Sequence, residues 1–229
     1  MKKKLFAMGL GAALAAGAAF GELISWNVDA LIPDNDPMGL QDTRELSGFL
    51  DVIDALEVWL KISAAPSSLA WNGDLFVTLQ HDSGYAVLLN RVGVTASQPL
   101  GYGHNGFEIT FAIGGLDIHN YSSYSPVFGG AGELLGTWGV DGRNVDPDLV
   151  LDTDARTDML ASFAGLDPNG NWTLFVADLN QNGAMQLDSW GLNVSAIPEP
   201  ATTGLMLLGG MLLWRHGRSV ARRRESTSS

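Results

Sequence analysis

Apolar and polar residues alternate with a period of two through much of the chain, and this pattern constrains the fold more than any other feature. From Leu56 to Ile62, four aliphatic residues occupy every second position, with charged residues and a tryptophan between them. The same alternation recurs in residues 75–80, 107–113, 172–176 and 190–194. Successive side chains of a strand point to opposite faces, so each segment predicts a half-buried strand. Clusters of Gly, Asn and Asp between these segments predict turns. We therefore expect an all-β fold, an antiparallel sandwich or barrel.

The remaining segments carry weaker signals. The turn His81-Asp82-Ser83-Gly84 predicts a hairpin, and residues 158–164 predict one short helix with Thr157 as its N-cap. Residues 19–49 are rich in Asp and Pro, so we expect a lead-in strand and a loop before the sandwich. We expect the sandwich itself to cover residues 50–196.

The first residues have the composition of a secretory signal peptide. Lys2, Lys3 and Lys4 precede an apolar run from Leu5 to Ala18 that ends in an Ala-Gly-Ala cleavage site. An uncleaved anchor helix is the alternative, but the run is shorter than the about 20 residues that a spanning helix needs. We therefore expect residues 1–18 to be a signal peptide, used by the Sec translocon and removed by signal peptidase.

The other end combines a short apolar run with a basic terminus. Residues 201–214 are apolar, and five arginines follow them. At about 1.5 Å per residue this run makes a helix about 21 Å long, shorter than a hydrocarbon core of about 30 Å. The arginines predict a cytoplasmic tail and an exported domain by the positive-inside rule. The segment is marginal as a permanent anchor.

Charge separates the folded region from both ends. The chain has 13 Lys and Arg against 25 Asp and Glu, and the region between leader and tail keeps 5 basic and 23 acidic residues, a net charge of about −18. Such a domain repels nucleic acid phosphates but offers many carboxylates to hard cations such as calcium. We expect no nucleic acid partner. Because the chain has no cysteine, disulfides and thiolate chemistry are excluded.

A series of short motifs in a fixed order resembles the P domain, also called Homo B, that follows the subtilisin-like catalytic domain of proprotein convertases. The motifs are Gly73-Asp74-Leu75, residues 84–91, residues 167–174 with Trp172, residues 176–178, and residues 183–192 with Trp190. The resemblance covers about residues 50–194 and implies a jelly-roll β-sandwich without catalytic residues. Residues 117–156 depart from the usual length, so we expect a Gly- and Asp-rich insertion there.

Residues 197–224 resemble the PEP-CTERM sorting tail of exopolysaccharide-producing Gram-negative bacteria. Its parts are Pro198-Glu199-Pro200, the short apolar helix and the cluster Arg222, Arg223 and Arg224. The resemblance implies processing by an exosortase, with the chain inserted transiently in the inner membrane and then carried to the cell surface or extracellular matrix. We expect the mature protein to lack the segment after about Pro200, as with other removed C-terminal signals.

We do not expect the chain to be an enzyme. It has no Gly-x-Ser-x-Gly motif and no room for a subtilisin domain. The Gly101 to Gly106 segment fits G-x-G-x-x-G but precedes an expected strand, so it predicts a loop rather than a phosphate site. We expect His81, His104 and His119 to be solvated loop residues.

A calcium site is the sharpest candidate for a bound ion. Asp178, Asn180 and Asn182 occupy positions one, three and five of a loop with Gly183 at six, as at the start of a calcium loop. Position twelve is Ser189, with Asp188 one place earlier. A plain hairpin turn explains the same residues. Asp74 is a further candidate ligand, and capping a turn is its alternative role.

Two functions remain open. The first is a surface or matrix module that binds polysaccharide or an envelope protein, without catalysis. Aromatic residues suited to sugar stacking are Trp59, Trp71, Tyr102, Tyr121, Tyr124 and Trp138, with a place in the core as the alternative for several of them. The alternative is an accessory domain that stabilises or regulates a separately encoded subtilisin-like serine protease.

Overall fold

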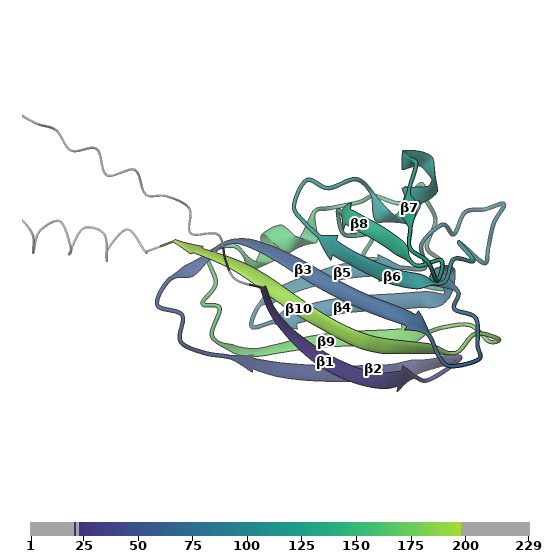
Figure 1. Cartoon of the computed structure of the whole chain (residues 1–229). Helices are drawn as coiled ribbons and strands as arrows, with labels where there is room; N and C mark the ends of the chain where they lie inside the picture. Colours follow the sequence, from purple (N-terminus) through teal and green to yellow (C-terminus); the bar gives the residue numbers. More distant parts are fainter. Residues whose placement is uncertain (1–20, 22, 198–229) are drawn as a thin grey trace, which may run out of the picture.

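The computed structural model describes residue 21 and residues 23–197, which form two β-sheets facing each other (Figure 1). The six-stranded sheet has the order β1 (Leu23–Ile32), β10 (Met185–Ile197), β3 (Val52–Ala64), β6 (Gly106–Phe111), β8 (Leu134–Trp138), β7 (Val127–Phe128). The four-stranded sheet has the order β2 (Asp36–Leu46), β9 (Gly170–Asp178), β4 (Leu75–His81), β5 (Gly84–Asn90). The expected all-β fold is confirmed, and the jelly-roll assignment stays a prediction.

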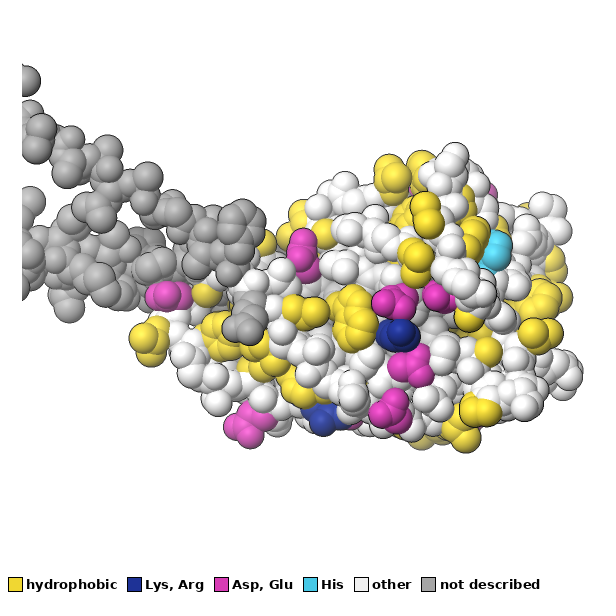
Figure 2. All heavy atoms as spheres, viewed as in Figure 1, with side chains coloured by type: hydrophobic (Ala, Val, Ile, Leu, Met, Phe, Trp, Pro, Cys, Tyr) yellow, Lys and Arg dark blue, Asp and Glu magenta, His cyan; other side chains and the backbone are white. Residues whose placement is uncertain are grey.

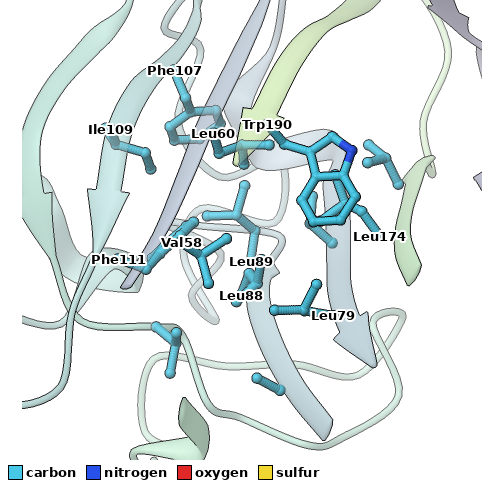
Figure 3. Packing of buried hydrophobic residues seen from close by; sticks show 14 of the residues in the cluster. Val58, Leu60, Leu79, Leu88, Leu89, Phe107, Ile109, Phe111, Leu174 and Trp190 are labelled. Carbon is cyan, nitrogen blue, oxygen red and sulfur yellow. The ribbon is translucent and has the colours of Figure 1, made fainter. Parts of the chain in front are cut away.

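The core lies between the two sheets, as the alternation predicts. Val58 and Leu60 of β3 project from the six-stranded sheet toward Leu79 and Leu89 of the other sheet, and all four side chains are fully buried (Figure 3). Burying such a side chain stabilises the fold by about 1.5–3 kcal/mol before conformational entropy is subtracted. Trp59 and Lys61, which alternate with these residues on β3, are partly exposed.

Residues 23–46 contribute one strand to each sheet. β1 pairs with β10, whereas β2 pairs with β9. The chain therefore changes sheets at the turn between them, where Asn35 has a φ of 52°. The segment expected as a lead-in to the sandwich is thus built into both of its sheets.

The segment 117–156 carries most of the irregular structure. It contains the 3₁₀ helix η2 (Ile118–Tyr124) and strands β7 and β8. β8 pairs with β6 in parallel, with Phe107 opposite Leu134, while every other pair among the described strands is antiparallel. The prediction of an antiparallel sandwich was therefore wrong for the β6–β8 pair. A parallel pair needs a long crossover, which residues 112–133 provide.

The predicted hairpin and short helix are both present. His81 is paired with Gly84 in the β4–β5 hairpin, and the helix is the short 3₁₀ helix η3 (Met159–Phe163), with Asp158 rather than Thr157 as its N-cap. Gly84 is required because a Cβ there would collide with the ring of Phe163. A third 3₁₀ turn, η1 (Asn72–Asp74), precedes β4.

The leader, residues 1–18, and the sorting tail after Ile197 lie outside the described residues. This includes the processing candidates Pro198, Glu199, Pro200, Arg222, Arg223 and Arg224. Across the described part of the chain, no helix has the length and hydropathy of a membrane span.

Candidate functional site

Asp74 and Asp178 lie side by side at one end of the four-stranded sheet. Asp178 is the last residue of β9, and Asp74 ends η1 just before β4. Leu75 is the cross-strand partner of Asp178, and the amide of Leu179 donates to the carbonyl of Asp74 at 2.9 Å. Cross-strand partners share a face of the sheet, so Asp178 points toward the core, as Leu75 does.

Asn180 connects the two carboxylates. Its backbone amide donates to Oδ1 of Asp178 at 3.2 Å, and its side-chain Nδ2 donates to Oδ1 of Asp74 at 3.3 Å. Asp178 is 0% exposed and Asp74 3% exposed. The second oxygen of Asp178, Oδ2, is buried and accepts no hydrogen bond. Such an orphaned buried oxygen is uncommon in native proteins.

Burial dominates the electrostatics of this pair. It raises the pKa of Asp178 to about 7, opposed by the hydrogen bond from the Asn180 amide and reinforced by the negative charges of Asp74 and Asp34. Burial also raises the pKa of Asp74, against the effects of Asn180 and of the positive charge of Arg91. Two carboxylates that are both costly to ionise thus share one small region.

A hollow of about 290 Å³ opens beside Asn180. Its walls are Trp71, Asp74, Leu100, Asn180, Gln181 and Asn182. The predicted ligands Asp74, Asn180 and Asn182 therefore line one hollow, and Asn180 joins Asp178 to them.

Asp188, the fifth predicted ligand, lies in a different environment. It sits at a β-bulge of β10, where its Oδ1 accepts from Ser63 and Gln186. None of the hydrogen bonds of the described residues joins it to the Asp178 loop. The described residues also contain no group of three or more His, Asp or Glu side chains placed to hold a metal.

Two of the three described histidines are buried, so the expectation of solvated loop residues was wrong for His81 and His119, whereas His104 lies in a loop and is half-buried. His81 stacks on Trp172 at 4.0 Å between ring centroids, and its ring nitrogens lie 3.0 and 2.7 Å from the carbonyls of Asn171 and Asp167. His104 lies 2.7 Å from the Tyr121 hydroxyl. In the described part of the chain, no histidine ring is hydrogen bonded to a serine or threonine hydroxyl.

A buried network of ion pairs among Asp117, His119, Asp141 and Arg143 connects the 117–156 segment to the sandwich. Asp141 is 0% exposed; one of its oxygens lies 2.8 Å from Nδ1 of His119 and the other 3.3 Å from the guanidinium of Arg143. Arg143 also pairs with Asp117 at 2.8 Å, and Asp141 accepts from the amide of Asn90 in β5. Sequence reasoning missed this network. The available signal was that two of the five basic residues of the folded region, Arg143 and Arg156, lie in this segment.

The geometry of this network favours the protonated form of His119. Its Nδ1 faces Asp141 and its Nε2 faces the carbonyl of Val94 at 3.0 Å, and only an imidazolium can donate to both. Burial alone lowers the pKa of His119, and Arg143 lowers it further. The hydrogen bond to Asp141 and that carboxylate's charge outweigh both effects, so the pKa is raised.

The outer face of the six-stranded sheet presents one central tryptophan. Trp59 of β3 is partly exposed and lies between Gly191 of β10 and Thr110 of β6. Polar side chains flank this row on both sides: Asn193 donates to Glu57 at 2.9 Å, and Lys61 pairs with Glu108 at 2.9 Å. In this view, Figure 2 shows a dark blue side chain surrounded by acidic and hydrophobic ones.

The other candidate aromatic residues differ in exposure. Tyr121 and Trp138 are core residues, 0% and 5% exposed, so they are excluded as sugar-stacking residues. Trp71 and Tyr102 are half-buried, and Tyr124 is 41% exposed. Only Trp59 among the six lies on the outer face of a central strand.

The outer face of the four-stranded sheet is hollowed over β4 and β9. The hollow has a volume of about 370 Å³, and Phe76 and Phe175 meet edge to face there at 6.3 Å. The remaining lining residues are Pro37, Asp146, Pro147, Asp148, Ala177 and Leu179. This surface combines an apolar floor with two carboxylates.

No protein-family model and no curated protein matches the chain. The P-domain and sorting-tail resemblances therefore rest on the motifs alone. Among solved structures, the serine protease of Aeromonas sobria in complex with its chaperone, ORF2, is similar at 16% identity over 78% of this chain, with a TM-score of 0.41. The same protease without the chaperone matches at 16% identity over 77% of this chain, also with a TM-score of 0.41. The chain spans about a quarter of the length of these structures, at 27% and 26%. A likeness at this level does not extend to function.

Proposed function

We propose that the protein is an exported, non-catalytic module that binds polysaccharide on the outer face of the six-stranded sheet. The observation that supports this is the position of Trp59 in the middle of that face. Gly191, directly opposite on β10, presents no side chain beside Trp59. A partly exposed indole ring suits the apolar face of a sugar.

The neighbours of Trp59 supply polar groups for sugar hydroxyls. Glu57 and Glu108 accept hydrogen bonds, and Lys61 and Asn193 donate them. Thr110 adds a hydroxyl in the same row. An apolar surface with a few fixed polar groups is the usual chemistry of a specific binding site.

The two ends of the chain are proposed to bring the module to the polysaccharide outside the cell. The leader directs export across the inner membrane, and an exosortase removes the tail after transient insertion, leaving the module at the surface or in the extracellular matrix. The motifs Lys2-Lys3-Lys4 and Pro198-Glu199-Pro200 support this route.

Replacing Trp59 with alanine is expected to weaken polysaccharide binding by about tenfold or more, since loss of a central aromatic from an interface costs about 2 kcal/mol. The measurement is affinity electrophoresis of the purified protein in gels containing exopolysaccharide from the producing strain. Phe76→Ala, on the opposite face, is the matched control and retains binding. Equal retardation of the Trp59→Ala variant and the wild type contradicts the proposal.

A second candidate is an accessory domain for a separately encoded subtilisin-like protease. The observation that favours it is the hollow over Phe76 and Phe175, whose apolar floor and two carboxylates suit an apolar segment with a basic residue. Co-purification of such a protease with the wild type, lost in the Phe76→Ala variant and kept in the Trp59→Ala variant, would support this function over the first.

A further inference from the structure

We propose that Asp74, Asp178 and Asn180 form a binding site for one calcium ion, at the end of β9 beside the hollow that Asn182 lines. The site is independent of the polysaccharide surface, which lies on the other sheet. It contains residues from two places in the chain, because Asn180 and Asp74 are 106 positions apart.

The first argument is that buried negative charge here has no partner. Among the described residues, neither Asp74 nor Asp178 forms an ion pair with Lys, Arg or His. The guanidinium of Arg91 donates instead to the carbonyls of Gly73 and Pro99. Carboxylates this deeply buried are normally paired or bound to a metal, because an uncompensated buried charge is very costly.

The second argument is the orphaned oxygen. Oδ1 of Asp178 accepts from the Asn180 amide, whereas Oδ2 of Asp178 is enclosed and accepts no hydrogen bond. An oxygen that accepts nothing from the protein remains available to a cation. This observation is separate from the number of acidic residues nearby, and it points to a ligand.

The third argument is the kind of donor. The candidate protein ligands can all present oxygen: two carboxylates and the side-chain amide of Asn180. The oxygen of that amide accepts from the Gln181 amide while its nitrogen faces Asp74, so a bound ion requires the amide to turn over. Calcium takes six to eight oxygen ligands in flexible geometry, whereas zinc prefers nitrogen and sulfur. Two carboxylates also balance the charge of one divalent cation. The residues present therefore fit calcium.

Calcium must then stabilise the folded protein. The unfolded chain does not hold Asp74 near Asp178, so the ion binds the folded state selectively. At a calcium concentration about one hundred times Kd, a rise in Tm of about 5–10 °C is expected for a domain of this size. The measurement is thermal unfolding of the purified full-length protein, in chelator and in calcium.

Asp178→Asn is the diagnostic variant. It removes one buried negative charge, so its Tm in chelator is expected to equal or exceed that of the wild type, while the rise with calcium is lost. Asp188→Asn is the matched control, because Asp188 also has a buried oxygen without a partner but lies outside the site. It is expected to keep the full rise. No rise in the wild type, or an equal rise in the Asp178→Asn variant, overturns the proposal.

Terbium provides a second readout that does not depend on stability. Trp71 lines the hollow together with Asp74, so its excited indole is expected to sensitise the luminescence of a terbium ion bound in place of calcium. Calcium should displace the signal, Trp71→Phe should abolish it without changing the calcium-induced rise in Tm, and Asp74→Asn should weaken terbium binding at least tenfold. Luminescence that persists unchanged in the Asp74→Asn and Asp178→Asn variants contradicts the site.

Discussion

Replacing Asp141 with alanine is expected to lower the free energy of unfolding by about 3–5 kcal/mol, because removing one partner of a buried ion pair leaves the other charge uncompensated. Asp141 is fully buried and accepts from His119, Arg143 and the amide of Asn90. Its loss leaves an imidazolium and a guanidinium without their shared carboxylate. The measurement is urea denaturation at neutral pH.

Asp146→Ala is the control for this prediction. Asp146 belongs to the same segment but is exposed, so the substitution should change stability by no more than about 0.5 kcal/mol. A loss below about 1 kcal/mol in the Asp141→Ala variant would show that the network does not hold the segment to the sandwich.

The pH dependence of stability provides a further readout of the same variant. The raised pKa of His119 means that the folded state binds its proton more tightly than the unfolded state. The resulting stabilisation is complete below a pH of about 6.5 and is lost as the pH rises through the folded-state pKa. The groups facing the ring are Asp141, Arg143 and the carbonyl of Val94. The Asp141→Ala variant should lose this dependence.

Replacing Trp190 with alanine is expected to lower the free energy of unfolding by about 3–5 kcal/mol, as for other buried aromatic side chains. Trp190 is fully buried, packs against Trp26 at 4.7 Å between ring centroids, and donates from Nε1 to Asp42 at 2.6 Å. It therefore bridges β10, β1 and β2. Trp190→Phe keeps most of the ring and should cost less.

Chemical denaturation of the two Trp190 variants checks this prediction. It also tests the meaning of the P-domain-like motif, in which Trp190 is a prominent residue. Suppose that the alanine variant lost less than about 1 kcal/mol of unfolding free energy but no longer bound polysaccharide. The motif would then mark a binding site instead of the core.

The period-two alternation of apolar and polar residues predicted strands correctly where a strand has one buried and one polar face. β3, β4 and β10 lie in the interior of their sheets, and each was predicted with its inward residues. β1 alternates as well, because Ile24, Trp26, Val28, Ala30 and Ile32 are all more buried than the residues between them, but the sequence prediction did not use this pattern. On β2 the less exposed positions include Asp42 and Arg44, so the alternation of apolar and polar residues is weak there. The parallel pairing of β8 depends on long-range packing of the 117–156 segment, which no local pattern encodes.

The candidate calcium site was predictable in parts. Oxygen-bearing residues at alternate positions identified Asp178, Asn180 and Asn182, and the Gly-Asp-Leu motif identified Asp74. Their contact, however, depends on the register that places Leu75 opposite Asp178. Asp188 was included by loop spacing alone, but a bulge between Leu187 and Ser189 places it elsewhere. The buried role of His119 likewise depends on Asp141, 22 residues away in sequence.

The most direct test of the central claim is chemical-shift mapping of the isotopically labelled protein during titration with the exopolysaccharide. The account predicts shifts at the indole and amide of Trp59 and at its cross-strand neighbours Gly191 and Thr110, with little change at Phe76 and Phe175. Shifts confined to Phe76 and Phe175, or no shifts at saturating polysaccharide, would contradict it.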